Sequence, residues 1–236
     1  MNLGLGDTIF YELSGTEEKV NFKKLIKAQS RLVERVFFKP LKKSPRLVAG
    51  IDVAYAVKEG LGFAGVVVLE LPEFKLIERV GEVLKVKFPY VPGFLSFREA
   101  PVMIRAFRKL KNLPEVLFVD GQGLAHPRKA GIAVHLGVIL KIPTIGCAKK
   151  PLIKYFESPE NLKGATKPIY LGKEQVGWIL RTKKGVKPVF VSPGNLITLE
   201  DTLKLTLKCT TRYRLPEPIR LAHAFANELK KNFFEN

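Results

Sequence analysis

The spacing of apolar residues changes along the chain, and this change limits the folds that the chain can adopt. Three runs rich in β-branched residues follow one another with only short links, at residues 47–56, 63–71 and 76–88. This pattern predicts antiparallel strands in a meander or hairpins. Further on, apolar runs at 116–120 and 143–148 flank a helical pattern at 130–140, which predicts a parallel strand–helix–strand unit.

The remaining patterns complete an α/β chain. Later strands are expected at 168–171, 176–181 and 188–191, and helices at 22–36, from the 87–94 loop to about Lys111, at 199–208 and at 218–234. A length of 236 residues suits one domain spanning 1–236. The expected fold class is therefore α/β, with a mixed sheet in which antiparallel strands are followed by parallel strands and helices flank the sheet.

Charge indicates the kind of partner. Forty Lys and Arg residues against 22 Asp and Glu residues give a formal net charge of +18 and a pI near 9.9, which attracts polyanions such as nucleic acid. A membrane surface is the alternative, but no separate basic amphipathic helix supports it. Because no leader pattern or apolar run of membrane-spanning length is visible, a cytoplasmic protein without a membrane partner is expected. A monomer is expected as well.

A glycine-rich segment at 60–65 matches the dinucleotide-binding pattern G-x-G-x-x-G. That pattern needs a following helix, whose N-terminus receives the pyrophosphate. Here the next residues, Val66 to Leu69, are typical of a strand. We therefore expect a glycine-rich hairpin and no nucleotide site.

Asp52 interrupts an otherwise apolar strand. Strand alternation places Gly50, Asp52 and Ala54 on one face, so the acid lies between two small neighbours with room for something large to approach. A lone buried carboxylate is costly unless a cation or hydrogen-bond donors meet it. The alternative is a charge on the solvated face of an edge strand.

Two other acids lie at the ends of predicted elements. Asp120 ends a strand, where ligand sites gather in open α/β sheets, although a turn-forming Asp-Gly is the alternative. Glu99 lies near a helix start, where Ser96 to Glu99 fits the capping box S-x-x-E. Pro101 argues against that box, so we expect the helix to begin nearer Glu99 and its carboxylate to be free for another role.

Three acids from separate segments of a strongly basic chain suggest a metal site. Mg²⁺ prefers carboxylate oxygens and keeps several waters. An ion held in this way positions an attacking water and stabilises charge on a scissile phosphate. This hypothesis depends on Asp52, Glu99 and Asp120 converging in the folded chain.

Several long stretches, taken together and in order, resemble the endonuclease V family over nearly the full chain. They are residues 50–55 (GIDVAY), 89–99 (PYVPGFLSFRE), 119–128 (VDGQGLAHPR), 143–150 (PTIGCAKK), 213–218 (YRLPEP) and 220–223 (RLAH). The resemblance implies a ribonuclease-H-like fold and a DNA-repair endonuclease that cuts near deaminated adenine, whose base is hypoxanthine. It further implies hydrolysis of the second phosphodiester bond 3′ of the lesion, leaving 3′-hydroxyl and 5′-phosphate ends, with Mg²⁺ required and Mn²⁺ as a substitute.

The matched motifs also imply roles for individual residues. The metal-binding and catalytic carboxylates would be Asp52, Glu99 and Asp120. Lys149 would lie beside the scissile phosphate, and His223 near the metal or the attacking water. Spacing alone favours a different interpretation of His223, as a helix residue at the edge of an apolar stripe.

The resemblance implies a wedge and a base pocket as well. The strand-separating wedge would be Pro89, Tyr90, Val91 and Pro92, in which prolines stiffen the loop and the aromatic ring fills a gap in a base stack. The damaged base would turn out into a pocket. The residues matching its lining are Gly93, Leu95, Gly121, Gly131 and Ile132. The His126-Pro127-Arg128 segment is expected either to support the structure or to contact phosphate.

Two residues depart from the family pattern. Gln122 and Asn195 stand where the family commonly has His, and Gln122 could alter the pocket rim or the surroundings of the metal. Neither removes a proposed carboxylate, so we expect activity to survive. DNA is the favoured substrate, but RNA stays open because no motif reads the 2′-hydroxyl.

Two other functions fit parts of this pattern. One is a different ribonuclease-H-like nuclease, acting on junctions or RNA–DNA hybrids. The other is a non-catalytic basic protein that only binds nucleic acid through its phosphates. The spaced acids argue against a pure binder, because such a protein gains little from anionic groups in its groove.

Overall fold

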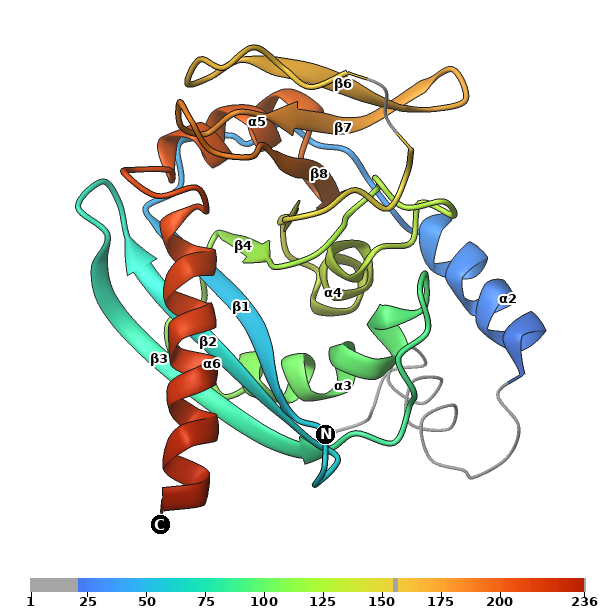
Figure 1. Ribbon diagram of the computed structural model, residues 1–236, viewed down its shortest axis with the longest axis vertical. Helices are drawn as coiled ribbons and strands as arrows, with labels where there is room; N and C mark the ends of the chain where they lie inside the picture. Colours follow the sequence, from blue (N-terminus) through green and yellow to red (C-terminus); the bar gives the residue numbers. More distant parts are fainter. Residues whose placement is uncertain (1–20, 155–156, 236) are drawn as a thin grey trace.

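One eight-stranded sheet runs through the molecule, with the strand order β3-β2-β1-β4-β5-β8-β7-β6 (Figure 1). The computed structural model describes residues 21–154 and 157–235. The strands are β1 (Leu47–Ala56), β2 (Leu61–Glu70), β3 (Lys75–Lys85), β4 (Val116–Val119), β5 (Thr144–Ala148), β6 (Thr166–Leu171), β7 (Glu174–Leu180) and β8 (Val189–Asn195). All the predicted strands are present: β1 has the predicted ends, and the ends of the other strands differ by a few residues.

The strand directions confirm the predicted mixed sheet. β1, β2 and β3 pair antiparallel, so the glycine-rich segment forms a hairpin and the nucleotide-binding interpretation stays rejected. β4 pairs parallel with β1 on one side and with β5 on the other, as the strand–helix–strand pattern predicted. Beyond β5 the sheet returns to antiparallel pairing through β8, β7 and β6.

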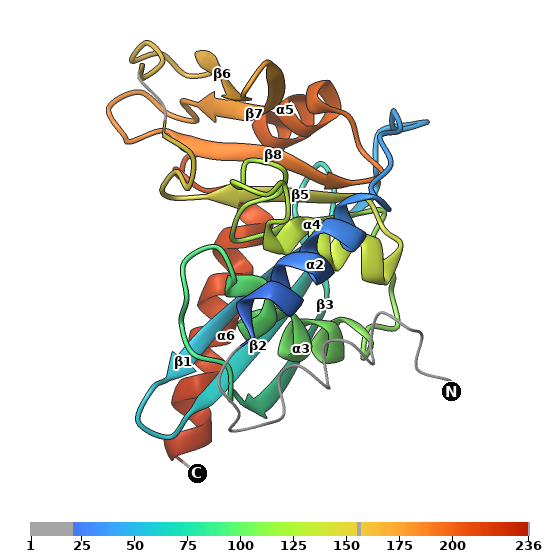
Figure 2. The same cartoon turned by 90° about the vertical axis from the view of Figure 1, so that its right-hand side faces the viewer.

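Helices cover both faces of the sheet. They are α2 (Phe22–Val33), α3 (Leu95–Phe107), α4 (Ile132–Leu140), α5 (Leu199–Lys208) and α6 (Glu217–Glu235). The long α6 crosses β1 and β2 on one face, and α3 and α4 cover the other (Figure 1). α2 lies across α4, and α5 packs on β8 and β7 (Figure 2). Among these helices none is long and apolar enough to cross a membrane.

Side-chain alternation along the central strands divides the core into two layers. In β4, Leu117 and Val119 join the buried cluster beneath α3 and α4, whereas Val116 and Phe118 join the cluster beneath α5 and α6. All four side chains are fully buried. A central strand buried on both faces in this way positions its carboxyl end rigidly, and Asp120 follows immediately.

Helix α3 departs from the prediction at its start. It begins at Leu95, not near Glu99, and Pro101 lies inside it. Ser96 does not cap the helix; its hydroxyl is buried and lies 3.1 Å from Nε2 of His135. Packing explains the early start, because Phe97 is buried in the core, and this packing outweighs the backbone hydrogen bond that Pro101 cannot donate.

The same helix ends at Phe107, four residues before the predicted end. The amides of Lys111 and Asn112 donate instead to the carboxylate of Glu78 on β3, at 2.8 to 3.1 Å. A side chain from another strand thus supplies the partner for these amides. The helical pattern alone could not reveal that contact.

Candidate active site

Asp52 lies on an interior strand and faces helix α6. β1 is flanked by β2 and β4, so the solvated edge-strand alternative is wrong. The small neighbour Gly50 lets the helix approach closely: a Cβ atom at Gly50 would lie 1.9 Å from the carbonyl oxygen of Pro218. The small residues beside Asp52 were expected to leave room for a large group, and in the structure helix α6 occupies that room. It brings Nδ1 of His223 to 2.6 Å from Oδ2 of Asp52.

The parallel strands bring two more site residues to the same place. Asp120 follows β4, and its amide donates to the carbonyl of Ile51 on β1 at 3.3 Å. Lys149 follows β5, and its ammonium group lies 2.5 Å from Oδ2 of Asp120. Because β1, β4 and β5 are adjacent and parallel, with Ile51 opposite Val119 and Val119 opposite Gly146, the register brings Asp52 in the middle of β1 beside the residues that follow β4 and β5.

The resulting group suits a divalent cation. Ligand atoms of Asp52, Asp120 and His223 all lie within 4.8 Å of one another. Asp52 is buried, with 9% of the residue exposed, and burial followed by the charge of Asp120 raises the pKa of its carboxyl group. Two carboxylates repelling each other beside an imidazole fit the oxygen and nitrogen donors of a divalent metal.

Glu99 lies close to this group but is not one of its three members. It comes from α3, on the face of the sheet opposite α6, and its Oε1 accepts a hydrogen bond from the Tyr55 hydroxyl at 3.1 Å. Burial, and then the charge of Asp52, raise the pKa of Glu99 to about 8, and Asp120 contributes further. Asp52 and Asp120 therefore lie close together, and Glu99 is near enough for their charges to raise its pKa.

The raised pKa of Glu99 predicts how the stability of the metal-free protein depends on pH. A carboxyl group with a higher pKa in the folded chain stabilises the fold below its ordinary value of 4.5, and this contribution is lost as pH rises through about 8. Thermal unfolding in EDTA is therefore expected to show falling stability across that window, by at most about 5 kcal/mol. Glu99→Gln should flatten the curve; an unchanged slope in this variant would contradict the assignment.

A pocket of about 300 Å³ opens beside the carboxylates. Its walls include every residue predicted for the base pocket, namely Gly93, Leu95, Gly121, Gly131 and Ile132, together with Tyr90 and Pro92 of the predicted wedge. Gly131 must be small, because a Cβ atom there would lie 2.2 Å from the carbonyl oxygen of Gln122. The structure therefore brings these residues around one cavity, and their role toward a base stays a prediction.

The His126-Pro127-Arg128 segment supports the pocket wall. The carbonyl oxygen of Gly93 accepts hydrogen bonds from Arg128 at 2.6 Å and from Gln29 of α2 at 2.9 Å, and the His126 ring lies 3.1 Å away. Burial and the Arg128 charge lower the pKa of His126 to about 4, so the ring is neutral near pH 7. Its Nδ1 accepts from the Arg128 amide, which leaves Nε2–H to donate to Gly93.

Sequence reasoning missed Gln29, which is fully buried and also accepts from Arg128 Nε at 2.6 Å. A glutamine on an amphipathic helix carries no signal of this role. It also did not predict that Lys150, Pro151 and Leu152 line the pocket, although Lys150 lies within a stretch that matched the family. These contacts arise only when distant segments pack together.

The two departures from the family pattern have separate structural roles. Gln122 lines the pocket and donates from Nε2 to the carbonyl of Lys150 at 2.9 Å, so it belongs to the pocket rim. Asn195 is buried away from the pocket. It donates to the Gly137 carbonyl at 2.9 Å and accepts from the Phe37 amide at 3.0 Å. Neither residue displaces Asp52 or Asp120.

The chain is similar to known proteins over most of its length. The family model described as Endonuclease V matches residues 30–224. Endonuclease V from Thermosipho melanesiensis is 44% identical over 212 residues, which cover 90% of this chain and 92% of that protein.

Solved structures agree with the fold. The crystal structure of Endonuclease V from Streptomyces avermitilis has a TM-score of 0.85 and 38% identity, covering 91% of this chain and 95% of that one. Endonuclease V from Ciona intestinalis, solved with a 24mer DNA containing an inosine followed by a ribo-adenosine, has a TM-score of 0.79 and 29% identity, covering 90% and 98%.

Proposed function

Because this chain belongs to the endonuclease V family, we propose that it is an endonuclease that cleaves nucleic acid near inosine. In detail, it hydrolyses the second phosphodiester bond on the 3′ side of the lesion and leaves 3′-hydroxyl and 5′-phosphate ends. A single catalytic domain does this, acting as a monomer. The observation that carries the proposal is that the buried Asp52 and the half-buried Asp120 meet a histidine and a lysine beside a pocket.

The donor set supports a requirement for Mg²⁺, with Mn²⁺ as a substitute. Asp52 and Asp120 would hold the ion, with Glu99 next to them and His223 at the edge of the group. When bound, a divalent cation stabilises negative charge on a phosphate and favours ionisation of a nearby water. The repulsion that raises the pKa of Asp52 would then become attraction toward the ion.

The side chains around the carboxylates suit phosphodiester hydrolysis. The Lys149 ammonium group is placed to bind a non-bridging phosphate oxygen and stabilise charge in the transition state. Asp52 holds Nδ1 of His223, and Nε2, which lies 3.4 Å from the side-chain amide of Asn227 in an exposed position, is the atom that takes a proton from the attacking water. The water oxygen bonds to phosphorus, the bond from phosphorus to O3′ breaks with its electron pair going to O3′, and O3′ takes up a proton from solvent water to become the 3′-hydroxyl.

The pocket supports recognition of a base turned out of its strand. Its volume of about 300 Å³ and its glycine-rich wall let a flat ring approach main-chain groups. Hypoxanthine differs from adenine in offering a carbonyl acceptor and a ring N–H donor, so paired backbone groups can tell the two apart. Gly93, Leu95, Gly121, Gly131 and Ile132 are the proposed lining.

Product mapping tests the function and its metal requirement together. With Mg²⁺, matched strands containing inosine in DNA or in RNA should be cut, and EDTA should abolish cutting until Mg²⁺ is restored. Junctions and RNA–DNA hybrids without inosine serve as controls, because faster cutting of either would favour a different ribonuclease-H-like nuclease. Intact inosine substrates in both Mg²⁺ and Mn²⁺ would refute the proposal.

The loop of Pro89, Tyr90, Val91 and Pro92 predicts a difference between duplex and single-stranded substrates. The Tyr90 side chain is 69% exposed at the mouth of the pocket, where it can enter a gap in a base stack. Tyr90→Ala should slow cutting of inosine in duplex DNA about tenfold or more, since stacking on one aromatic ring contributes about 1–3 kcal/mol. Single-stranded substrate should lose much less, and equal losses on both would contradict a wedge.

A further inference from the structure

A second, larger hollow lies beside the base pocket. It is an open groove of about 710 Å³, here called the β7–β8 groove and defined by the residues 149–151, 158, 161, 181, 185–188, 190 and 214. Five of these residues are basic, namely Lys149, Lys150, Arg181, Lys187 and Arg214, and none is acidic. A concave surface with one sign of charge focuses the field on an anionic ligand.

Hydrogen bonds hold the outer walls of this groove together. Arg181, at the end of β7, donates to Ser158 Oγ at 3.1 Å, to the carbonyls of Pro159 and Glu160 at 3.0 and 3.2 Å, and to the carbonyl of Val186. The amide of Gly185 donates to Asn161 Oδ1 at 2.8 Å. One guanidinium group thus ties two separate loops into a preformed wall.

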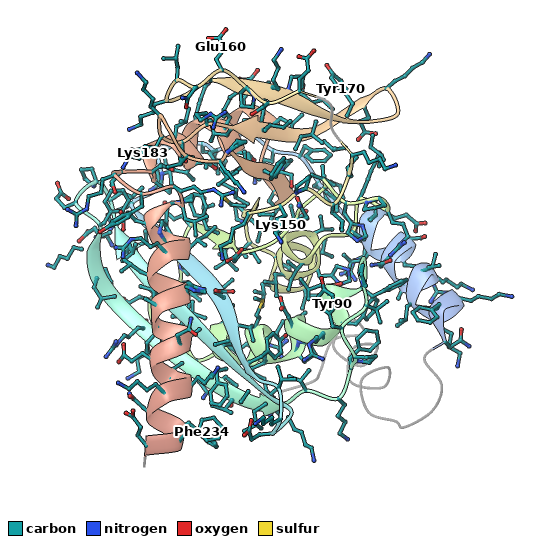
Figure 3. The ribbon with its side chains drawn as sticks, viewed as in Figure 1. Tyr90, Lys150, Glu160, Tyr170, Lys183 and Phe234 are labelled. Atoms are coloured by element: carbon teal, nitrogen blue, oxygen red, sulfur yellow. The ribbon has the colours of Figure 1, made fainter. Side chains whose placement is uncertain are left out.

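The groove is continuous with the catalytic group, by which we mean Asp52, Asp120, Lys149 and His223. Nη2 of Arg214 donates to the carbonyls of Lys149 and Pro188, both at 2.8 Å, so it joins the segment carrying the catalytic lysine to the groove wall. Lys150 and Pro151 line both the groove and the base pocket. Figure 3 shows Lys150 between Tyr90 on one side and the strands β6 to β8 on the other.

Lys149 pairs with Asp120, but two other lysines of the groove have no acidic partner among the described residues. Lys150 and Lys187 are exposed, and within residues 21–154 and 157–235 neither forms an ion pair with a carboxylate. Nearby lysines differ: Lys167 pairs with Glu157 at 2.7 Å, and Lys129 pairs with Glu174. Uncompensated cations lining a preformed groove are suited to phosphates supplied by a ligand.

We propose that the β7–β8 groove binds the backbone phosphates of the cleaved strand on the 3′ side of the cut. This inference rests on the proposed function, in which the bond that breaks is 3′ of the lesion. With the lesion base in its pocket and the scissile phosphate at Lys149, the groove that starts at Lys149 receives the nucleotides that follow. Lys187 and Lys150 are its main phosphate contacts.

The proposal is tested by measuring cleavage while the length of the 3′ arm of the substrate and the charge at residue 187 are varied. The probes are single-stranded inosine DNAs with a fixed 5′ arm and a 3′ arm that ends just after the cut or extends several nucleotides beyond it. For the natural protein with Mg²⁺, the longer 3′ arm should raise kcat/KM about tenfold, an effect that weakens with salt. Lys187→Glu should reduce this gain to about twofold or less, and its salt dependence should fall by about 0.7 in logarithmic slope.

Lys173→Glu is the matched control, because Lys173 is an exposed lysine in the β6–β7 turn outside the groove and outside the catalytic group. It should keep the full gain from the 3′ arm. Lys187→Gln, a milder change, replaces Lys187→Glu if that variant unfolds at a lower temperature than the control. A natural protein that cuts both lengths equally would overturn the groove assignment, and so would a Lys187→Glu variant that keeps the full gain from the longer 3′ arm.

Different results would contradict the proposed function and the groove assignment. If no inosine strand of any length is cut, the proposed function is wrong. If cutting is normal and Lys187→Glu keeps the gain from the 3′ arm, only the groove assignment is wrong.

Discussion

Asp52→Asn is expected to lower the cleavage rate on inosine-containing DNA by at least about a thousandfold, equivalent to about 4 kcal/mol of transition-state stabilisation. The asparagine keeps the shape of the side chain but loses the charge that would hold the metal and the partner that fixes His223 Nδ1 at 2.6 Å. Binding of the same DNA should be unchanged or tighter, because one negative charge has left a site that receives a phosphate.

Single-turnover cleavage and binding, measured on the same strand, check this prediction. Glu59→Gln is the control, since it removes one negative charge from an exposed turn far along the β1–β2 hairpin. In EDTA, Asp52→Asn should unfold at the same or a higher temperature than the natural protein, because burial and Asp120 raise the pKa of the acid that is removed. A variant that still cuts at more than a tenth of the natural rate would exclude Asp52 from catalysis.

Gly50→Ala is expected to destabilise the fold by about 3 kcal/mol or more and to abolish cleavage with it. The new Cβ atom would lie 1.9 Å from the carbonyl oxygen of Pro218 and 2.9 Å from the amide nitrogen of Ile219, and both are backbone atoms of α6. The first turn of the helix must therefore move away from β1. His223, farther along the same helix, would move away from Asp52.

Gly81→Ala is the matched control for this substitution. A Cβ atom at Gly81 on β3 also meets α6, at 2.4 Å from Cδ1 of Leu229, but that atom ends a flexible side chain that can rotate away. Its cost should stay near 1 kcal/mol, with cleavage preserved. Denaturant unfolding compares the two variants, and equal stabilities would show that α6 does not approach β1 as closely as the structure has it.

The sequence predicted the strands well because their signal is local. Alternation of apolar and polar residues identified β1 with both ends correct, and the apolar runs around α4 identified the parallel unit. The sequence predicted the end of α3 less well, because the amides that follow this helix donate to the carboxylate of Glu78 on a distant strand. Pro101 misled the prediction of the start of α3 because burial of Phe97 outweighed a local backbone preference.

The family motifs named the catalytic candidates, but residue spacing alone could not join them. Asp52 and His223 are 171 positions apart, and spacing favoured a packing role for the histidine. The His223 imidazole reaches the Asp52 carboxylate because α6 packs closely against Gly50. Glu99 comes from α3 and lies outside the tight group of Asp52, Asp120 and His223, but its carboxyl group feels the charges of both aspartates, and its part in metal binding stays a prediction.

Composition and local residue patterns were enough to predict the class of fold, the charged residues available for chemistry and the glycines that permit close approach. The folded chain was needed to see which of those residues meet, that the buried Gln29 supports the pocket, and where lysines without acidic partners line a groove. Contacts between segments far apart in the chain depend on packing geometry, which no local pattern encodes.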